Sequence, residues 1–352
     1  MGLGKTLQGI AIAKVYESEW PCLIVVPSAL RLVWKQELLK WLPDLDEEDL
    51  CVVMKGNDRM HGRVTVISYD LLARQQSDFG SSTRGSGSSP EWKRYGVLVV
   101  DESHYLKSIH AKRTKAVVPI ARAVKVAVFL SGTPALSRPA ELYNQISALR
   151  PRMFQNWNAY ATRYCDAKQG RFGLEFGGAS NLEELRALLR TVMIRRLKSE
   201  VLSQLPAKRR QQVHIELPSS RVKDIKKKLE QNAKLMSVLD DRAYPEAERR
   251  KAHQTSQQIL NEVYGESGLA KLPETTEYIN MLAEGGAKFL VFAHHKDVLD
   301  GICQSLRAQK EPVQHIRIDG NTAMAERERL ASTNQMSALD APKCCFLGYI
   351  YI

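Results

Sequence analysis

Short apolar runs rich in β-branched residues recur along the first 150 residues of this chain. They are predicted to be strands at Cys22–Pro27, Val64–Tyr69, Val97–Val100 and Lys125–Leu130. Continuous apolar runs of this length are typical of parallel strands buried on both faces. The intervening segments have helical periodicity. Strands that alternate with helices predict an α/β fold with a mostly parallel sheet and helices on both faces.

The helical segments are recognised by the spacing of their apolar residues. Leu7–Val15 is one predicted helix, and Leu30–Trp41 is another that places Trp34, Leu38 and Trp41 on one face. A stripe of this kind is more often core than a platform for stacking bases. Asp70–Arg74 is expected to open the next helix. The Ser- and Gly-rich stretch Ser77–Pro90 is predicted to be a flexible surface loop.

Residues 151–280 depart from this alternation. Met153–Tyr164 is predicted to be helical, and its aromatic stripe is expected to be core; the stripe consists of Phe154, Trp157, Tyr160 and Tyr164. Leu182–Leu205 is a second amphipathic helical region. Lys223–Gly265 is charged, helix-forming and poor in aromatics, so any core it makes is expected to be small.

A second strand–helix unit begins at Lys288–Ala293 and continues through the helix Val298–Leu306 to the strand His315–Ile318. The pair His294 and His295 suggests a metal at first sight. No further ligand spacing supports a metal, so a position at the helix entry, or one that faces a bound partner, is favoured.

The length and composition of the chain limit the number of domains, the kind of partner and the compartment. A length of 352 residues suggests two domains, and a net charge of +12 favours a polyanion such as nucleic acid, although a basic surface for solubility is the plain alternative. Six scattered cysteines without CxxC pairing fit reduced thiols in a cytosolic or nuclear protein. No apolar run approaches the length of a membrane span.

Two acids stand at the end of the run Val97–Val100. Ligands of open α/β sheets lie at the carboxyl ends of the strands, so Asp101 and Glu102 would emerge where chemistry is done. One acid can hold Mg²⁺ through water and the other can orient an attacking water. Alone, the pair fits a solvated strand end equally well.

The stretch Met1–Thr6, MGLGKT, supplies a partner for these acids. Gly-Lys-Thr at a helix N-terminus is the second half of a P-loop, in which Lys5 reaches the β and γ phosphate oxygens and the Thr6 hydroxyl ligates Mg²⁺. Gly2 and Gly4 allow the backbone to approach a phosphate closely. The first half of the motif is missing.

Together these motifs resemble a Swi/Snf-family ATPase of helicase superfamily two, and within it the annealing helicases of the HARP type. The resemblance runs from Met1 to about Arg329 and rests on MGLGKT, LIVVPSAL, VISYDLL, VVDESHYLKS, LSGTPALSRPAELYNQI, RYCDAK, MIRRLKSEVLSQLPAK, KFLVFAHHKDVLD and QHIRIDG.

The resemblance implies a role for each matching residue. Gly2, Gly4, Lys5 and Thr6 would hold the ATP phosphates and Mg²⁺, Asp101 would hold Mg²⁺, and Glu102 would be the catalytic base. Coupling of the nucleotide to the DNA-tracking surface would fall to His104, Ser131, Gly132 and Thr133. Without the family, the last three would be interpreted as a strand-to-turn corner.

DNA-side positions are also implied by the resemblance. Pro27, Ser28, Ser68 and Tyr69 would lie where backbone N–H and hydroxyl groups meet phosphate oxygens, although Ser28 could equally cap the following helix. Arg195 and Arg196 would lie near the cleft between two lobes. A solvated helix face is the plain alternative for the charges of Lys208–Arg210.

The implied organisation is a first RecA-like P-loop lobe at 1–150, a helical protrusion and linker at 151–280, the start of a second RecA-like lobe at 281–330 and a divergent tail at 331–352. Both ends are expected to be truncated. At one end the strand before Met1 is missing. At the other, the second-lobe arginines that reach the γ-phosphate are missing, and an arginine finger is worth about 10³–10⁵ in rate. The apolar tail is expected to expose a sticky strand as a non-native continuation.

Two functions follow. The first is a DNA-dependent ATPase that rewinds separated strands of branched DNA at stalled replication forks, in DNA repair in the nucleus. Its partners would be forked duplex DNA and, through a missing terminal region, a single-strand-binding protein. The second is a catalytically impaired DNA- or partner-binding fragment of such an enzyme. An RNA-unwinding function is disfavoured, because DESH followed by a long helical insert matches the Swi/Snf pattern.

Overall fold

The computed structural model describes residues 2–82, 91–133, 138–154, 156–170, 173–202, 204, 207–217, 219–240, 245–323, 326–327, 329–330 and 344–349. The chain divides into two compact units, residues 1–206 and 207–352. The segment expected to be a helical protrusion and linker, 151–280, is thus shared between the two units.

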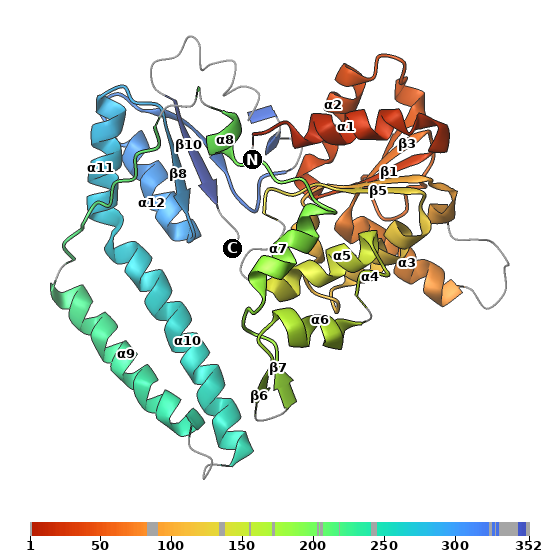
Figure 1. Ribbon diagram of the computed structural model, residues 1–352. Coiled ribbons are helices and arrows are strands. Elements are labelled where there is room, and N and C mark those ends of the chain that lie inside the picture. Colours follow the sequence, from red (N-terminus) through yellow and green to blue (C-terminus); the bar gives the residue numbers. More distant parts are fainter. Residues whose placement is uncertain are drawn as a thin grey trace. The chain divides into compact units, whose positions relative to one another are not determined.

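A five-stranded parallel sheet forms the centre of the first unit (Figure 1). Its order is β2-β3-β1-β4-β5, and its strands are β1 (Cys22–Val26), β2 (Leu50–Val52), β3 (Val64–Ser68), β4 (Val97–Val100) and β5 (Val126–Phe129). Every neighbouring pair runs parallel. The predicted α/β class with a mostly parallel sheet is confirmed.

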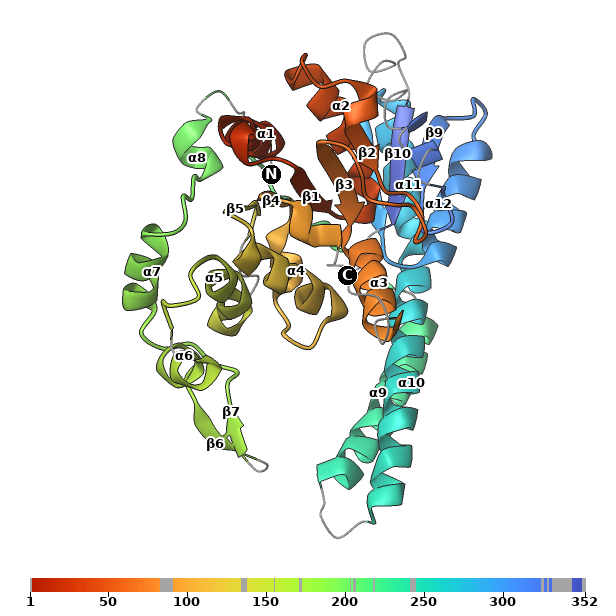
Figure 2. The same cartoon turned by 90° about the vertical axis from the view of Figure 1, so that its right-hand side faces the viewer.

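The strands are apolar throughout because both faces of the sheet are covered. In β1, Leu23 and Val25 point into one core and Ile24 and Val26 point into the other, as the two-residue period of a strand requires. Helices α1 (Lys5–Val15) and α2 (Arg31–Trp41) cover one face, and α3 (Tyr69–Ser82) and α4 (Lys112–Ala123) cover the other (Figure 2).

Two expectations about these helices were wrong. Ser77–Ser82 continues helix α3 and is not loop, while 83–90 lies outside the described residues. Trp34 and Leu38 are each 1% exposed, but Trp41 is 44% exposed and donates its indole N–H to Glu37. Trp41 turns toward Glu37 at the surface, and the core at this end of α2 is formed by Leu38 and, just past the helix, by Leu42.

The rest of the first unit is mostly helical. It contains α5 (Tyr143–Leu149), α6 (Trp157–Tyr164), the antiparallel pair β6 (Lys168–Gly170) and β7 (Gly173–Glu175), α7 (Leu182–Arg190) and α8 (Lys198–Val201). The predicted aromatic stripe is core, with Tyr160 and Tyr164 buried and Phe154 and Trp157 packed beside them. The helical region expected over Leu182–Leu205 is two helices with an irregular segment between them.

Short 3₁₀ turns connect several of these elements. They lie at Glu17–Glu19, Ser28–Leu30, Glu47–Asp49, Glu91–Arg94, Ser103–Leu106 and Pro139–Leu142.

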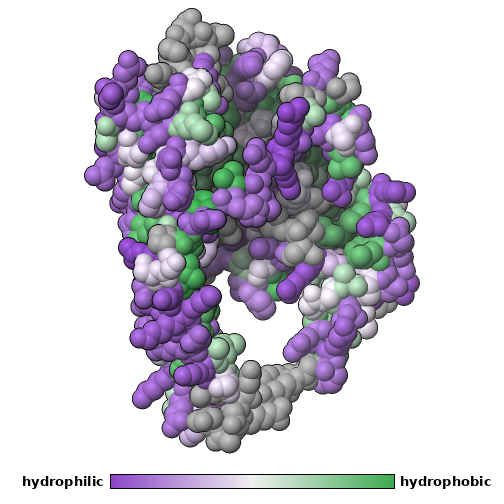
Figure 3. Space-filling view, turned by 90° about the vertical axis from the view of Figure 1, so that its left-hand side faces the viewer, coloured by the Kyte–Doolittle hydropathy of each residue, from purple (hydrophilic) through white to green (hydrophobic). Residues whose placement is uncertain are grey.

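The second unit opens with the long helices α9 (Ser219–Asp240) and α10 (Glu246–Ala270), which pack against each other as a hairpin. Lys228 of α9 bridges Glu262 and Glu266 of α10 at 3.0 and 2.7 Å. The face of the hairpin seen at the lower left of Figure 3 is predominantly hydrophilic. This agrees with the small core expected from its composition.

A three-stranded parallel sheet follows, built with α11 (Leu272–Glu284) and α12 (Lys296–Arg307). Its strands are β8 (Phe289–Ala293), β9 (Gln314–Ile318) and β10 (Cys344–Tyr349), in the order β8-β10-β9. The expectation that the tail exposes a strand was wrong for 344–349. β10 is the central strand, so both of its backbone edges are paired, with Phe346 opposite Leu290 and Ile316.

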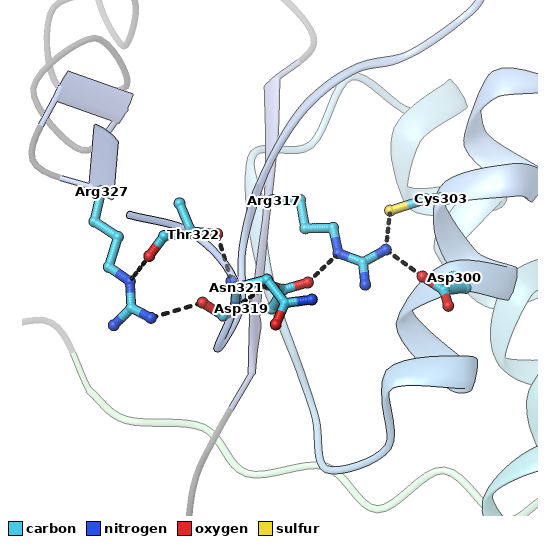
Figure 4. Close-up of polar contacts among 7 residues, drawn as sticks. All are labelled: Asp300, Cys303, Arg317, Asp319, Asn321, Thr322 and Arg327. Atoms are coloured by element: carbon cyan, nitrogen blue, oxygen red, sulfur yellow. Dashed lines mark hydrogen bonds and ion pairs between the residues drawn. The ribbon is translucent and has the colours of Figure 1, made fainter. Parts of the chain in front are cut away.

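Arg317 and Arg327 organise the end of β9 (Figure 4). The Arg317 guanidinium pairs with Asp300 and with Asp319. The backbone N–H of Asn321, and after it Arg317, holds the pKa of the Asp319 carboxyl below its usual value. Arg327 donates to the carbonyl oxygens of Asp319 and Thr322. These contacts fix the turn after β9.

Two further features of the described residues are the state of the cysteines and the length of the apolar helices. Cys22, Cys51, Cys165 and Cys303 are buried free thiols. Within the described ranges, no helix combines the length and the apolar content that crossing a bilayer needs.

Candidate nucleotide site

The predicted site residues follow the carboxyl ends of adjacent strands. Pro27 follows β1, Tyr69 follows β3, Asp101 follows β4 and Ser131 comes soon after β5. All pairings are parallel, with Val26 opposite Ser68 and Val100 opposite Phe129. These residues therefore lie along a single edge of the sheet, where ligands of open α/β sheets bind.

The glycine-rich stretch ends at Gly4, and helix α1 begins at the next residue, Lys5. Gly2 and Gly4 have φ angles of 78° and 67°, a left-handed conformation that glycine adopts without a steric penalty. The first turn of α1 contains no acidic residue, so the positive end of the helix dipole is not neutralised by its own side chains. This is the backbone geometry of a phosphate cradle.

Helix α1 is held against β4 through Gly9. A Cβ atom at Gly9 would lie 2.7 Å from Leu130, 3.2 Å from Trp34 and 3.4 Å from Val99, so only glycine allows this close approach. A helix that leads directly into a parallel strand runs back across the sheet, and β1 begins soon after α1 ends. Lys5 and Thr6, one turn before Gly9, are therefore at the edge that carries Asp101.

Asp101 is almost fully buried, at 5% exposure, and both of its carboxylate oxygens accept hydrogen bonds. The indole N–H of Trp34 donates to Oδ2 at 2.9 Å, and the backbone N–H of Glu102 donates to Oδ1 at 2.9 Å. The Asp101 backbone is fixed as well, since its carbonyl accepts from the Tyr69 hydroxyl at 2.6 Å. A carboxylate with this support is preorganised to hold a cation.

Glu102 adopts a left-handed backbone, with φ of 49°, which is uncommon for a residue with a side chain. Its Oε2 lies 3.1 Å from Nδ1 of His104, and the same nitrogen lies 3.1 Å from the Ser131 hydroxyl. Ser131 in turn accepts from the Thr133 backbone N–H at 3.2 Å. A continuous polar path thus joins Glu102 to the segment after β5.

The turn after Asp101 is anchored by α5. The Ser103 hydroxyl bonds Gln145 at 2.9 Å, and Asn144 donates to the carbonyl oxygens of Leu106 and Lys107. Gln145 and Asn144 are buried and come from a helix that lies 37 to 42 residues after their partners in the chain.

The predicted DNA-side residues divide into two groups. Pro27 is half-buried and Ser28 is exposed, at the carboxyl end of β1. Ser68 and Tyr69 are 2% and 3% exposed, so their hydroxyls do not reach the surface, where the expected contact with phosphate would be made. Both hydroxyls are used internally, because Ser68 accepts from the Leu71 N–H and Tyr69 donates to Asp101.

Arg195 and Arg196 are exposed, in the irregular segment before α8. Lys198, the first residue of α8, lies beside the glycine-rich stretch: its Nζ is 3.5 Å from where a Cβ of Gly2 would be. The structure thus brings a further cation to the predicted phosphate cradle.

The donor set fits Mg²⁺ bound with a nucleotide. Among the described residues, no group of three or more His, Cys, Asp and Glu side chains could hold a metal by itself, and this includes His294 and His295. Mg²⁺ usually takes one or two protein oxygens and completes its shell with water and substrate phosphates. Asp101 at the end of β4 and Thr6 in the first turn of α1 supply two such oxygens at the same edge of the sheet.

Sequence reasoning missed four residues that shape this site: Trp34, Tyr69 in its internal role, Gln145 and Lys198. Trp34 was expected only as core, and periodicity does not reveal where an indole N–H points. A buried carboxylate needs hydrogen-bond donors. The sequence therefore indicated that a neighbouring element supplies a donor to Asp101, but not which residue it is.

Comparisons with known proteins agree with this architecture. A model of the SNF2-related domain matches residues 1–266. Over 340 residues the chain is 42% identical to the SWI/SNF-related matrix-associated actin-dependent regulator of chromatin subfamily A-like protein 1 of Xenopus laevis, covering 96% of this chain and 33% of the relative. Over 343 residues it is 42% identical to the DNA annealing helicase and endonuclease ZRANB3 of Mus musculus, covering 95% and 30%.

Among solved structures, the SWI2/SNF2 ATPase core of Sulfolobus solfataricus in complex with dsDNA is similar at 20% identity and a TM-score of 0.47, covering 99% of this chain and 72% of that one. The chain spans about a third of the length of the curated relatives it matches. The family model accounts for well over half of the 352 residues, so the chain belongs to the SNF2-related domain family.

Proposed function

We propose that this chain is the ATP-hydrolysing motor of a DNA translocase of the annealing-helicase type, which rewinds separated strands of branched DNA at stalled replication forks in the nucleus. The observation that carries the proposal is the buried carboxylate of Asp101, held by Trp34 at the edge of the sheet where α1 begins. The family supports it, as do the relatives, one of which is named a DNA annealing helicase.

Each residue at the edge has a proposed role. Gly2, Gly4 and Lys5 bind the triphosphate, and Thr6 and Asp101 hold Mg²⁺, which would neutralise charge on the phosphates. Glu102 accepts a proton from the attacking water, since its side chain is only partly buried and follows the metal-holding acid. His104, with Ser131, Gly132 and Thr133, passes the state of the nucleotide to the DNA-binding side, a role supported by the path from Glu102 to Ser131.

The proposed organisation follows the family. Residues 1–150 form the ATP-binding lobe, 151–280 the helical protrusion and linker, and 281–330 the start of the second lobe, with a divergent tail at 331–352. Arg195, Arg196, Pro27 and Ser28 remain proposed DNA-side residues. A contact with a single-strand-binding protein remains a prediction.

DNA is the proposed polyanion. The net charge of +12 favours phosphate contacts. Such contacts give affinity that falls steeply with salt and depends little on sequence. Forked duplex is proposed over plain duplex because annealing takes place where duplex meets separated strands, and the annealing activity is carried over by analogy with the named relative alone.

ATP hydrolysis by the purified chain, with and without forked DNA, tests the proposal. Glu102→Gln keeps the shape of the side chain but removes the base, so DNA-stimulated turnover should fall about 10²–10⁴-fold. Equal turnover in the two proteins would refute the assignment of Glu102. Forked DNA bound by the wild type with no turnover would favour the second function, a catalytically impaired DNA-binding fragment.

A further inference from the structure

A basic segment follows the acid pair directly. Lys107–Lys115, KSIHAKRTK, contains four Lys and Arg residues, and no Asp or Glu occurs anywhere between Glu102 and Glu141. Lys107, Lys112 and Lys115 are exposed. This long stretch of chain therefore carries formal charge of a single sign.

This segment lies at the same edge of the sheet as the candidate nucleotide site. It leaves the carboxyl end of β4 and enters α4, which runs back along the sheet and is followed by the start of β5. With about 1.5 Å rise per residue, the twelve residues of α4 are about 18 Å long, enough to cross the sheet. The N-terminal turn of α4, with Lys112, Arg113 and Lys115, is thus beside the edge that carries Asp101.

Three planar side chains, of Arg113, Tyr105 and Tyr69, stack one on the next from this surface toward the core. The Arg113 guanidinium lies over the ring of Tyr105, with Cζ 5.0 Å from the ring centroid. Tyr105 is 37% exposed and stacks on buried Tyr69, with ring centroids 5.5 Å apart and an interplanar angle of 23°. Arg113 is therefore linked to the Tyr69 ring through Tyr105.

Tyr69 then acts on the peptide between the two acids. Its hydroxyl donates to the Asp101 carbonyl at 2.6 Å. The Glu102 N–H in the same planar peptide donates to Asp101 Oδ1. One peptide plane thus sets both the Asp101 carboxylate and the left-handed backbone of Glu102.

We infer that Lys107–Lys115 binds the phosphate backbone of DNA and that Tyr105 and Tyr69 transmit this contact to the Asp101–Glu102 peptide. DNA phosphates pull on Lys112, Arg113 and Lys115, and the stacked rings carry the shift to the peptide that places the acids. Tyr69 and Tyr105 are positioning residues, which touch neither nucleotide nor DNA. The transmission half of this inference rests on the proposed function, whereas the DNA-contact half does not.

The DNA contact is tested by binding alone. Fluorescence anisotropy of a labelled duplex is measured over a range of salt concentrations for the full chain and for two double variants, K112A/K115A and the control K40A/K93A. The control removes the same amount of charge, from exposed lysines of α2 and of the turn before β4. Each lost phosphate contact lowers the slope of log K against log salt by about 1. The slope should fall by about 2 in K112A/K115A and stay unchanged in K40A/K93A. Equal slopes in both variants would overturn the contact.

The transmission is tested by Tyr69→Phe, which keeps the ring stack and removes only the hydroxyl. The affinity for duplex should be unchanged, while the ratio of DNA-stimulated to DNA-free ATP turnover falls about 2- to 10-fold, the effect of one lost hydrogen bond. Arg113→Lys, which keeps the charge but loses the planar contact with Tyr105, should retain the salt slope and lose stimulation in the same way. Full stimulation in both variants would refute the transmission.

The two failures are distinguishable. If the wild-type chain hydrolyses no ATP under any condition, the proposed function fails and the transmission with it, but the salt slopes still decide whether Lys107–Lys115 contacts DNA. If hydrolysis is stimulated by DNA and Tyr69→Phe leaves the stimulation intact, only the transmission fails.

Discussion

The indole Nε1 of Trp34 donates a 2.9 Å hydrogen bond to Oδ2 of Asp101, between two side chains that are 1% and 5% exposed. Trp34 comes from α2 and Asp101 from the end of β4, so this one bond ties a helix on one face of the sheet to its carboxyl edge. A hydrogen bond to a charged group in a buried setting contributes about 1.5–3 kcal/mol.

Trp34→Phe should therefore impair hydrolysis more than folding. The ring of phenylalanine retains most of the packing, but Asp101 loses a donor, and loss of a supporting partner around a metal site typically costs about 10- to 100-fold in activity or metal affinity. We expect a higher Mg²⁺ requirement for ATP turnover, measured by Mg²⁺ titration.

Trp41→Phe is the matched control for this prediction. Trp41 lies in the same helix and donates an equivalent indole N–H to Glu37, but it is exposed. Its replacement should leave the Mg²⁺ titration unchanged. A similar shift in both variants would show that the Trp34–Asp101 bond has no special role.

Gly96→Ala should destabilise the first unit. A Cβ atom at Gly96 would lie 2.0 Å from the carbonyl oxygen of Glu19, and a backbone atom cannot rotate away as a side chain can. Overpacking costs about 1–3 kcal/mol, occasionally more. The free energy of unfolding in urea measures it.

Gly265→Ala gives the contrasting case. Apart from the backbone of its own helical turns and its chain neighbours, no atom of the described residues lies within 4 Å of a Cβ at Gly265, inside helix α10. There alanine should stabilise by roughly 0.5–1 kcal/mol, because glycine is the poorer helix former. Equal destabilisation by the two substitutions would contradict the steric account of Gly96.

The stability of the first unit should depend on Glu184 in acid. Hydrogen bonds from Arg163 and Tyr164 lower the pKa of Glu184 to about 2. Because the folded pKa is below the unfolded value, this carboxylate contributes its stability fully above the unfolded pKa and loses it as pH falls through about 2.

Glu184→Gln tests this dependence. The wild type should be the more stable protein in urea at neutral pH, and the difference between the two should shrink as the solution is acidified below the ordinary range for Glu. Because the ion pair between Arg163 and Glu184 is exposed to solvent, the difference in stability between the two proteins should also diminish in high salt. A difference that is constant from neutral to acid pH would contradict the role of the charge.

Leu347→Pro should unravel the sheet of the second unit. Position 347 lies in β10, opposite Val291 on one side and Arg317 on the other, and proline removes a backbone donor from the ladder. We expect hydrogen-exchange protection to fall in both β8 and β9. Leu347→Thr keeps the donor and serves as control. Protection lost in β9 alone would show that β10 is not central.

The sequence alone determined the class of the first unit and the residues that belong at its functional edge. Runs such as Cys22–Pro27 and Val97–Val100 are apolar without alternation, and only a strand covered on both faces needs that pattern. Asp101 and Glu102 follow such a run, and parallel strands carry their ends to one edge whatever the details of packing. These are local properties, readable from neighbouring residues.

The tertiary structure decided which polar groups meet. Spacing puts Trp34 and Trp41 on one face of α2, yet only Trp34 is buried and bonded to Asp101. Trp41 bonds to Glu37 at the surface, and the next residue, Leu42, packs in the core instead. Tyr69 was expected to face DNA, and it instead holds the Asp101 backbone. β10 pairs between two strands that precede it by more than 25 residues. Each outcome depends on the direction of a donor or the partner of a strand, and these are set by contacts between residues far apart in the chain.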